Sequence, residues 1–535
     1  MSAVSVRDHG AVGDGVTNDA PAINAALAAV AAAGGGTLLI DAGTYIVDSS
    51  IFMQPGVRLL GDGRARITQR AGGNVGVMFE FGASAHDAAI EHCIIDGNRS
   101  GNADSVDKTL IHVRHSHRVT IAQNKILNSN GYGVASNATH TTISDNTISN
   151  CFMQGVGIYS GNGAPSVDAF IRIERNRMDT FGPSAIIFGN SNYGIIHGNS
   201  IQANVIGGRG NRLIVNIAGN VVTRVSGPSF ASIKPGMCVV VNGGMEFRVE
   251  SIAGDSSLVV AGTPPALSNV RAAIGTGDVI GLVASSFCVV SDNIILGGVT
   301  FGIALSLGGN AGQLGNNLIS GNSLSYSGKN AINVSWDSGS GYLNNNSIVG
   351  NKIMNPGNSG GIGPDDMIGI FVASQRPGKC EYTFIDGNSV ICDSGEGRSE
   401  YWLGTDGNGS PGSVMVGRNI ATNMVNGGIK RDVLNVVLDG WGSSATSFVE
   451  SNGHTLRLRI VAGGAGQTAA PSVKINKICT SPEAPLMLRG EMSTAGAGAA
   501  LRFIWGTQLG SPGEWICYYD GTPVAGGSYT ICLQA

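Results

Sequence analysis

Four acidic side chains in the second half of the chain could carry out acid–base chemistry on a sugar. Asp337 ends the segment NAINVSWD, Asp365 and Asp366 open the segment DDMIGIFVAS, and Glu396 precedes YWLG. Hydrolysis of a glycosidic bond generally uses two carboxyl groups, about 5–5.5 Å apart for retention and about 6.5–9.5 Å apart for inversion. The segments share one strand pattern, so we expect these acids to lie on one repeat of the structure or on neighbouring repeats. The catalytic pair is expected among them.

Four further residues could bind the substrate of such a reaction. Trp336 and Tyr159 could stack on the faces of sugars, and Lys329 and Arg376 could pair with the carboxylates of an anionic polymer. In the predicted mechanism, one protonated acid gives its proton to the glycosidic oxygen. The second carboxylate activates a water molecule or attacks the anomeric carbon.

Lyase chemistry is the alternative enzyme reaction. It needs a base beside a uronate carboxylate, often with calcium held by Asp. The available bases are Arg172, Arg175, His197 and Lys329, and no spacing singles one of them out. His115 and His117 share one face of a strand, but no third ligand is evident. The sequence therefore predicts neither a metal site nor another cofactor.

The elements that must position these groups are short apolar strands marked by a recurring asparagine. The series is Asn124, Asn146, Asn176, Asn199, Asn293, Asn322, Asn351 and Asn388, with Cys93 and Asn419 extending it at either end. Successive members are 31, 22, 30, 23, 94, 29, 29, 37 and 31 residues apart. Repetition at this period, with a strand as the unit, predicts a solenoid of stacked parallel strands.

The asparagines themselves are expected to be structural. Equivalent turn residues in stacked coils lie about 4.8 Å apart. Asn tolerates the left-handed turn conformation, and its amide can donate to one neighbour and accept from the other. A second strand family, which includes GVGIYS and NAINVS, alternates so that Tyr159 and Asn333 are expected to face outward.

The spacing also divides the chain into parts. The step of 94 residues exceeds an ordinary coil by about seventy residues, which map to 207–279 and read as short strands separated by Gly, Asn and Pro. This predicts a small β domain inserted between two β-helix parts, 51–206 and 280–428. Residues 1–50 are expected to form an N-terminal cap. Alternating strands in 429–535 predict a C-terminal antiparallel β-sandwich.

Composition and charge exclude several functional classes. Charged residues make up 13% of the 535 residues and glycine occurs 82 times, which favours strands and turns. The net charge of −4 is scattered, so neither nucleic acid nor a membrane surface is an expected partner. No apolar run could span a membrane, and the first residues lack the features of a signal peptide. The nine widely spaced cysteines are expected to be reduced core residues.

The N-terminal segment carries a family resemblance. VRDHGAVGDGVTND (6–19) precedes a helical pattern with Ile23, Leu27 and Val30 on one face, which Asn18 or Asp19 can cap. A glycine triplet and DAGTY follow it. This order resembles the N-terminal signature of the pectate-lyase-like superfamily, although His9 replaces the usual aromatic residue and Asp41 the usual proline. The resemblance implies a right-handed parallel β-helix, with one long sheet and its loops forming an elongated groove for a polysaccharide.

Two further resemblances concern function. The segment Asp365–Ile370 looks like the Asp-Asp-x-Ile-x-Ile segment that carries catalytic acids in polygalacturonase-type β-helices, although the other motifs of those enzymes are not found in order. The whole arrangement resembles bacteriophage tailspikes, which are usually homotrimers that bind and cleave bacterial capsule or lipopolysaccharide. This implies a homotrimer in a virion tail, attached through a part outside this chain, or an extracellular protein. A secreted polysaccharide enzyme, a polysaccharide lyase or a receptor-binding adhesin are the alternatives.

Overall fold

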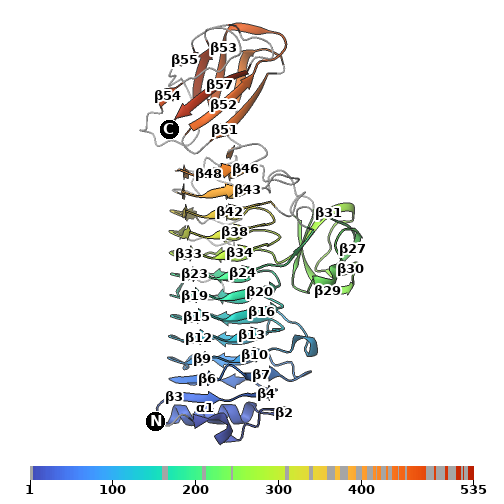
Figure 1. The fold of residues 1–535 in the computed structure, drawn as a ribbon, viewed down its shortest axis with the longest axis vertical. Helices are drawn as coiled ribbons and strands as arrows, with labels where there is room; N and C mark the ends of the chain where they lie inside the picture. Colours follow the sequence, from blue (N-terminus) through green and yellow to red (C-terminus); the bar gives the residue numbers. More distant parts are fainter. Residues whose placement is uncertain are drawn as a thin grey trace.

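The chain forms a long parallel β-helix that carries a small barrel on its side and a further pair of sheets beyond its C-terminal end (Figure 1). The computed structural model describes residues 4–159, 167–207, 212–241, 245–307, 313–335, 342–357, 368–373, 383–392, 401–405, 414–416, 418–422, 429–431, 436–443, 445–451, 455–476, 487–489, 501–503, 514–519, 522 and 528–534.

Two of the three sheets of the β-helix contain thirteen strands each. The first sheet consists of β1 (Val4–Ser5), β3 (Gly36–Ile40), β6 (Val57–Gly61), β9 (Ala89–Glu91), β12 (Thr120–Ala122), β15 (Thr142–Ser144), β19 (Arg172–Glu174), β23 (Ile195–His197), β33 (Val289–Ser291), β37 (Leu318–Ser320), β41 (Ser347–Val349), β44 (Thr383–Asp386) and β47 (Val414–Val416). The second consists of β2 (Asp14–Asn18), β4 (Gly43–Val47), β7 (Ala65–Gln69), β10 (Ile94–Asp96), β13 (Lys125–Leu127), β16 (Thr147–Cys151), β20 (Arg177–Phe181), β24 (Ser200–Gln202), β34 (Ile294–Leu296), β38 (Ser323–Ser325), β42 (Lys352–Met354), β45 (Ser389–Ile391) and β48 (Ile420–Thr422).

The third sheet contains twelve parallel strands and positions the candidate site. In spatial order they are β5 (Ile51–Phe52), β8 (Val77–Phe81), β11 (Thr109–Val113), β14 (Tyr132–Ser136), β17 (Val156–Tyr159), β21 (Ile186–Gly189), β32 (Ile280–Val283), β35 (Ile303–Ser306), β39 (Ile332–Ser335), β43 (Ile368–Ala373), β46 (Tyr401–Thr405) and β49 (Ile429–Arg431). The strand repeats thus form the predicted parallel β-helix.

The core of the helix is a stack of inward-facing aliphatic side chains. In short strands of the first sheet the middle residue is buried, as with Ile121, Ile143 and Ile173, which are register partners on successive coils. β-Branched side chains fit this arrangement because the pleated strands direct alternate residues to opposite faces. These apolar columns hold the coils in register.

The predicted asparagine ladder is present along the turn before the second sheet. Each Nδ2 donates to Oδ1 of the next asparagine at 2.9–3.2 Å, from Asn124 through to Asn419. Each described Nδ2 also donates to a backbone carbonyl, as from Asn199 to Ile173. The ladder therefore satisfies buried amides and turn backbone together, as a structural role requires.

A second column of turn residues runs along the edge of the first sheet. Its members all have φ between 50° and 58°, and they are Asp87, Arg118, His140, Phe170, Tyr193, Phe287, Asn316 and Asn345. The rings from His140 to Phe287 stack at centroid distances of 5.0, 4.8 and 5.1 Å. Stacking between coils offsets part of the strain of left-handed backbone in bulky residues.

The N-terminal end of the solenoid is covered by α1 (Ala20–Ala32), which follows η1 (Val6–His9) (Figure 1). Ile23, Leu27 and Val30 are buried against the first coils, as the helical pattern predicts. Of the two predicted caps, Asn18 accepts from the N–H of Ala20 at 3.3 Å, whereas the Asp19 side chain makes no cap hydrogen bond. Its carboxylate accepts from the backbone N–H groups of Val12 and Gly13 at 2.6 and 3.2 Å, so it fastens the preceding loop instead.

The inserted domain is an antiparallel barrel between β24 and β32. Its strands are β25 (Val205–Ile206), β26 (Leu213–Ala218), β27 (Val221–Ser226), β28 (Cys238–Val241), β29 (Met245–Gly254), β30 (Ser257–Val260) and β31 (Leu267–Gly275), with η3 (Phe230–Ser232) before β28. The sheet closes because β31 pairs with both β26 and β28. The barrel has its own apolar core and projects from the side of the helix (Figure 1).

The C-terminal strands form two four-stranded antiparallel sheets. One contains β50 (Val436–Trp441), β53 (Gln467–Asn476), β56 (Glu514–Tyr519) and β55 (Leu501–Phe503). The other contains β51 (Thr446–Ser451), β52 (Thr455–Val461), β57 (Ser528–Gln534) and β54 (Met487–Arg489). Short pairs elsewhere are β18 (Val167–Asp168) with β22 (Ser191–Asn192) and β36 (Gln313–Gly315) with β40 (Tyr342–Asn344).

Five described cysteines are free thiols. Four of them, Cys93, Cys151, Cys288 and Cys392, are buried, and Cys238 is partly buried. Burial raises the pKa of Cys93 and Cys288 to about 12, which leaves these thiols protonated and unreactive. In the part of the chain that the structure describes, the helices are too short or too polar to cross a membrane.

Candidate functional site

The third sheet contains the strands that flank the predicted catalytic acids in the chain. β39, β43 and β46 are successive neighbours, and their register aligns Asn333, Phe371 and Gly404. The acids and two of the predicted binding residues lie outside the described residues: Asp337, Asp365, Asp366, Glu396, Trp336 and Arg376. Their roles therefore stay predictions, and the described ends of the strands provide the geometry.

These strand ends restrict how the predicted acids could pair. Ser335 ends β39, and its register partner on β43 is Ala373. Ile368 begins β43 five residues earlier, so the two strand ends are about 16 Å apart at about 3.3 Å per residue. In the chain, Asp337 follows the last residue of β39, whereas Asp366 precedes the first residue of β43. We call the edge where the strands of the third sheet begin its amino-terminal edge, and the opposite one its carboxyl-terminal edge.

Tyr159 lies at the carboxyl-terminal edge, where it ends β17. It is 38% exposed, and its ring meets the ring of Tyr132 edge-on with centroids 6.3 Å apart. A Cβ atom at Gly157 would lie 3.0 Å from both rings, so this position needs glycine. Burial raises the pKa of both tyrosine hydroxyls. The side chain of Tyr159 is thus partly exposed while its hydroxyl interacts with Tyr132, which leaves part of the ring for its predicted contact with a sugar.

Lys329 lies at the amino-terminal edge and already has an anionic partner. It is 8% exposed, and its Nζ lies 3.1 Å from Oε1 of Glu246 and 5.8 Å from the ring centroid of Phe301. Glu246 belongs to β29, so this ion pair joins the barrel to the third sheet. A sugar carboxylate bound by Lys329, as predicted, would have to share the ammonium group with Glu246.

The sequence analysis missed Asp278, which lies between the barrel and β32. Its carboxyl group accepts hydrogen bonds from the Thr300 hydroxyl and from the N–H of Phe301, the latter at 3.4 Å. Burial raises the pKa of Asp278 to about 6, the Thr300 hydrogen bond opposes this, and the nearby charges of Glu246 and Lys329 act in opposite directions. Asp278 is therefore a carboxylic acid that can hold its proton close to neutral pH.

One sequence signal could have found Asp278. It precedes Ile280, the first residue of β32, by two positions, and Asp366 precedes Ile368 of β43 by the same offset. The sequence does reveal the family of strands to which β32 belongs. The inserted barrel, however, separates Asp278 from the preceding coil, so its position in the repeat is hard to recognise.

Asp278 belongs to a column of residues along the amino-terminal edge. The members precede the register-paired residues of β17, β21, β32, β35 and β39 by two positions, and they are Gln154, Ser184, Asp278, Phe301 and Asn330. The side-chain carbonyl oxygens of Gln154 and Asn330 are buried and have no hydrogen-bond partner. Leaving such an oxygen unpaired costs roughly 1–3 kcal/mol, so these sites favour a donor from outside the chain, such as water or a ligand hydroxyl.

The outer face of β39 is more covered than the alternation pattern predicts. Asn333 does not reach solvent: it is 3% exposed and donates from Nδ2 to the Ser335 hydroxyl at 2.9 Å. The outward prediction for Asn333 is therefore wrong with respect to exposure. The segment after β42 contributes to this cover, since the N–H of Gly357 donates to the carbonyl of Lys329 at 2.9 Å.

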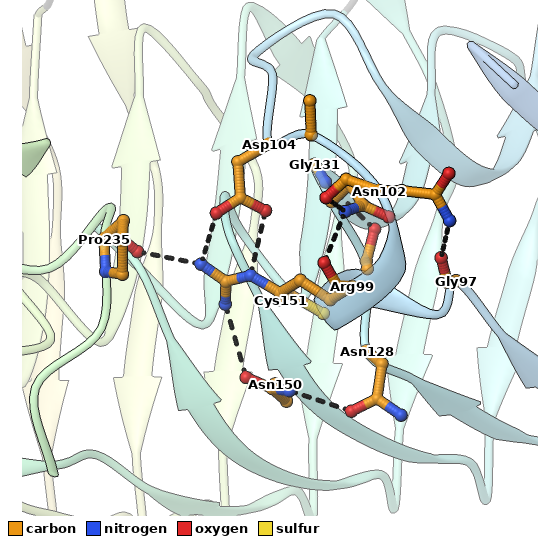
Figure 2. A network of polar contacts seen from close by, with 12 residues as sticks. Gly97, Arg99, Asn102, Asp104, Asn128, Gly131, Asn150, Cys151 and Pro235 are labelled. Atoms are coloured by element: carbon orange, nitrogen blue, oxygen red, sulfur yellow. Dashed lines mark hydrogen bonds and ion pairs between the residues drawn. The ribbon is translucent and has the colours of Figure 1, made fainter. Parts of the chain in front are cut away.

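The barrel is held against the helix by a nearly buried arginine, shown in Figure 2. The guanidinium of Arg99 pairs with both oxygens of Asp104 at 2.9 and 3.0 Å and donates to the carbonyl of Pro235 at 3.1 Å (Figure 2). It also donates to Oδ1 of Asn150 at 3.3 Å. Pro235 lies in the barrel, 136 residues further along the chain, so Arg99 ties the two parts together.

Phe152 strengthens this junction by lying between two arginines. The guanidinium carbons of Arg99 and Arg248 lie 5.5 and 4.7 Å from its ring centroid, a distance at which cation–π attraction contributes. Arg248 belongs to β29, the strand that also carries Glu246. The contacts at Arg99, Phe152 and Lys329 therefore fix β29 relative to the third sheet.

The predicted lyase bases other than Lys329 lie away from the third sheet. Arg172 on β19 pairs with Glu174 at 2.7 Å, and Arg175 pairs with Asp145 at 2.8 Å. His197 on β23 lies 3.0 Å from the Ser291 hydroxyl. These three side chains are on or beside the first sheet, where each contacts a neighbouring polar side chain.

Metal ligation has no described candidate. Among the residues that the structure describes, no group of three or more His, Cys, Asp or Glu side chains could hold a metal ion. His117 stacks on His86 with ring centroids 3.7 Å apart. Of the two histidines considered as metal ligands in the sequence, His115 and His117, the second therefore has a packing partner.

Comparisons with known proteins agree with the fold. Residues 3–85 match the family model for rhamnogalacturonase A/epimerase, pectate lyase-like, and residues 109–254 match the model for the right handed beta helix region. The predicted pectate-lyase-like resemblance and the right-handed parallel β-helix are thereby confirmed. The Dettilon tailspike protein, a solved structure, is 12% identical with a TM-score of 0.49, covering 99% of this chain and 94% of its own.

Curated relatives match a short part of the chain. The mannuronan C5-epimerase AlgE1 of Azotobacter vinelandii is 34% identical over 118 residues, which is 19% of this chain and 8% of the relative. Alginate lyase 7 of the same organism is 32% identical over 116 residues, 19% of this chain and 14% of the relative. This chain thus spans a small fraction of either relative.

Proposed function

We propose that this protein is an enzyme that cleaves a polysaccharide by glycoside hydrolysis, with its chemistry at the amino-terminal edge of the third sheet. The observation that carries the proposal is the carboxyl group of Asp278. Burial raises the pKa of this group to about 6, and the charges of a second carboxylate, Glu246, and of Lys329, which lie 3.1 Å from each other, both act on it. A protonated acid beside an ionised carboxylate is the arrangement that glycoside hydrolysis uses.

The acids predicted from the sequence remain part of this proposal. Asp365 and Asp366 precede β43 in the chain, and Glu396 precedes β46. Each of them therefore comes before the start of a strand of the third sheet, as Asp278 does. Asp337 follows the opposite strand end, about 16 Å away along the strand direction. The described geometry therefore favours Asp365, Asp366 and Glu396 over Asp337 as members of one pair.

The proposed substrate is a polysaccharide that contains sugar acids or is carried on a bacterial surface. The matched relatives are enzymes of mannuronan and alginate, which supports a polymer substrate with sugar carboxylates. Capsule and lipopolysaccharide remain the substrates proposed from the tailspike resemblance. A homotrimer, an extracellular or virion location, and attachment to a virion through a part outside this chain belong to the same proposal.

A lyase or epimerase is the second candidate, because the matched relatives carry those names. Both reactions begin with removal of a proton next to a carboxylate and need a base there. Burial raises the pKa of Tyr159, which disfavours it as a base. Arg172, Arg175 and His197 are engaged on or beside the first sheet. Lys329, the remaining predicted base, lies at the proposed site with its ammonium group paired with Glu246. These contacts support hydrolysis over proton abstraction.

A polysaccharide panel tests the proposal. The purified chain is incubated with mannuronan, alginate, polygalacturonate, and extracted bacterial capsule and lipopolysaccharide. Hydrolysis gives new reducing ends without ultraviolet absorbance. Absorbance of unsaturated uronates would replace the hydrolase with a lyase, and deuterium uptake at C5 without cleavage would replace it with an epimerase. Binding without any product would replace it with an adhesin.

Asp278→Asn provides the site control for this assay. The variant should lose at least 100-fold in rate, as expected when a general acid is removed. Asp255→Asn changes an exposed acid of the barrel and should leave the rate unchanged. Equal activity of the two variants would move the chemistry away from Asp278.

A further inference from the structure

Asp278 and Glu246 come from different domains and are linked through Lys329. The N–H of Lys329 donates to the carbonyl of Thr300 at 2.7 Å, and its Nζ lies 5.8 Å from the ring centroid of Phe301. Thr300 and Phe301 are the hydrogen-bond donors of Asp278. Asp278 lies at the start of β32 in the helix, and Glu246 lies on β29 of the barrel. The ammonium group of Lys329 lies 3.1 Å from Glu246, and its charge and that of Glu246 both act on Asp278. The docking of the barrel on the helix therefore decides whether the carboxylate of Glu246 lies near Asp278.

The position of Glu246 is fixed by more than this ion pair. Two residues further along β29, Arg248 lies over the ring of Phe152, whose other neighbour is the nearly buried Arg99. The register pairs Glu246 with Val240 of β28, and Val240 is fully buried. Positioned carboxylates of this kind can act without a large rearrangement.

A second observation points to a ligand here. Asn330 follows Lys329 in the chain and belongs to the column that contains Asp278. Its side chain is buried, its Nδ2 donates to Asn333 at 3.2 Å, and its Oδ1 has no partner. The hydroxyl of Ser327 is likewise buried without a partner. Sugar hydroxyl groups are donors that could satisfy such oxygens.

We propose that Glu246 of the inserted barrel is the second carboxylate of the hydrolase, opposite Asp278, so that the barrel completes the active site. This inference rests on the proposed hydrolase function and replaces Asp365, Asp366 and Glu396 as partners of Asp278. The ligand is a saccharide bound where the barrel meets the amino-terminal edge of the third sheet.

The reaction balances with water as the co-reactant. The Asp278 carboxyl group donates its proton to the glycosidic oxygen as the bond from that oxygen to the anomeric carbon breaks. Glu246 accepts a proton from water as the water oxygen bonds to the anomeric carbon. Asp278 ends ionised and Glu246 ends protonated, and proton exchange with solvent restores both. Among the described residues, Glu246 and Lys329 are charged groups whose charge acts on Asp278, and Thr300 and Phe301 are its hydrogen-bond donors.

The test compares glutamine substitutions on one strand. Glu246→Gln keeps the size of the side chain and should lower the rate of reducing-end release at least 100-fold. Glu250→Gln, an exposed position on the same face of β29, should leave it unchanged. Asp365→Asn, Asp366→Asn and Glu396→Gln are measured beside it, because these acids are the competing candidates for the second carboxylate. All assays use the full chain and the panel of polysaccharides named above.

The outcomes separate this inference from the proposed function. Absence of cleavage by the unchanged chain across the whole panel would overturn both. Cleavage that survives in Glu246→Gln would overturn the inference alone, and loss in Asp365→Asn or Asp366→Asn instead would return the pair to those acids.

A purely structural role of Glu246 gives a different result. If the side chain only docked the barrel, Lys329→Met would lower activity as much as Glu246→Gln and would lower the thermal unfolding midpoint with it. If Glu246 is catalytic, Glu246→Gln loses at least 100-fold in rate at unchanged KM, whereas Lys329→Met, which breaks the same ion pair, loses much less. In addition, the limb of the pH–rate profile near pH 6 that belongs to Asp278 should remain in Glu246→Gln.

Discussion

Asn199 donates a hydrogen bond from Nδ2 to Oδ1 of Asn293 at 2.9 Å, although 94 residues separate them in the chain. The ladder thus continues across the inserted barrel as if the barrel were absent. The stability of the β-helix should therefore depend on the ladder at this point and little on the sequence of the insertion.

Removing one member of the ladder should be costly. Asn199 is buried, donates to Asn293 and to the Ile173 carbonyl, and accepts from the N–H and Nδ2 of Asn176. Asn199→Ala leaves several of these groups unpaired, each worth about 1–3 kcal/mol. We expect a loss of about 3 kcal/mol or more in the free energy of unfolding, measured by urea denaturation.

Asn220→Ala is the matched control, because Asn220 is exposed in a barrel turn. Its free energy of unfolding should stay within about 0.5 kcal/mol of the unchanged chain. A similar loss in both variants would mean that the ladder contributes no special stability.

The aromatic column gives a second prediction, in which backbone strain and stacking oppose each other. Tyr193 has φ of 58° and stacks between Phe170 and Phe287. Tyr193→Ala loses both stacks, worth about 0.5–1.5 kcal/mol each, and keeps the strain. Tyr193→Gly loses the same stacks but relieves about 1 kcal/mol of strain. Denaturation should therefore rank the unchanged chain first, Tyr193→Gly second and Tyr193→Ala last. If Tyr193→Ala were the more stable of the two variants, strain would not matter here.

The periodic parts of this protein could be predicted because each coil repeats one physical problem. A buried amide such as Asn146 must pair with the next coil, so its spacing in the sequence reports the length of a coil. The insertion was visible for the same reason, as one step that was too long. The strands of the C-terminal sheets alternate, which indicated antiparallel sheets without a ladder.

The candidate site could not be predicted in the same way. Asp278 and Glu246 are 32 residues apart in the sequence, and only the docking of the barrel brings them near Lys329. This docking depends on Arg99 reaching the carbonyl of Pro235, a contact to the backbone that leaves no signature in residue types. The burial of Asn333 was missed because alternation gives the face of a sheet but not what covers it.

Asp278 predicts a pH dependence of stability. Its pKa is about 6 in the folded chain and about 3.8 when unperturbed, so the folded state holds the proton more tightly. The stabilisation by this proton is complete below about pH 4 and is lost as pH rises to about 6, a change of about 3 kcal/mol. Asn has no titratable carboxyl group, so Asp278→Asn lacks this pH dependence. Between pH 4 and 6, the free energy of unfolding of the variant should therefore rise relative to that of the unchanged chain.

Urea denaturation at several pH values checks this expectation, with Asp255→Asn as the control. The control should follow the pH dependence of the unchanged chain. A difference between the unchanged chain and Asp278→Asn that does not vary with pH would show that Asp278 titrates normally and cannot serve as an acid near neutral pH.

Arg99 predicts how firmly the barrel is held. Its side chain is 9% exposed, and its guanidinium connects Asp104, Asn150 and the Pro235 carbonyl. Arg99→Met leaves the carboxylate of Asp104 without its partner. Breaking a buried pair costs about 3–5 kcal/mol, and the loss here should be smaller because Asp104 is 23% exposed. Hydrogen exchange should therefore speed up in β28 and β29, while the asparagine ladder stays protected. Arg64→Met is the control, since the Arg64 side chain is 80% exposed and its ion pair with Asp62 should contribute at most about 1 kcal/mol. Unchanged exchange in β29 of Arg99→Met would mean that other contacts hold the barrel, and the position of Glu246 would then not depend on Arg99.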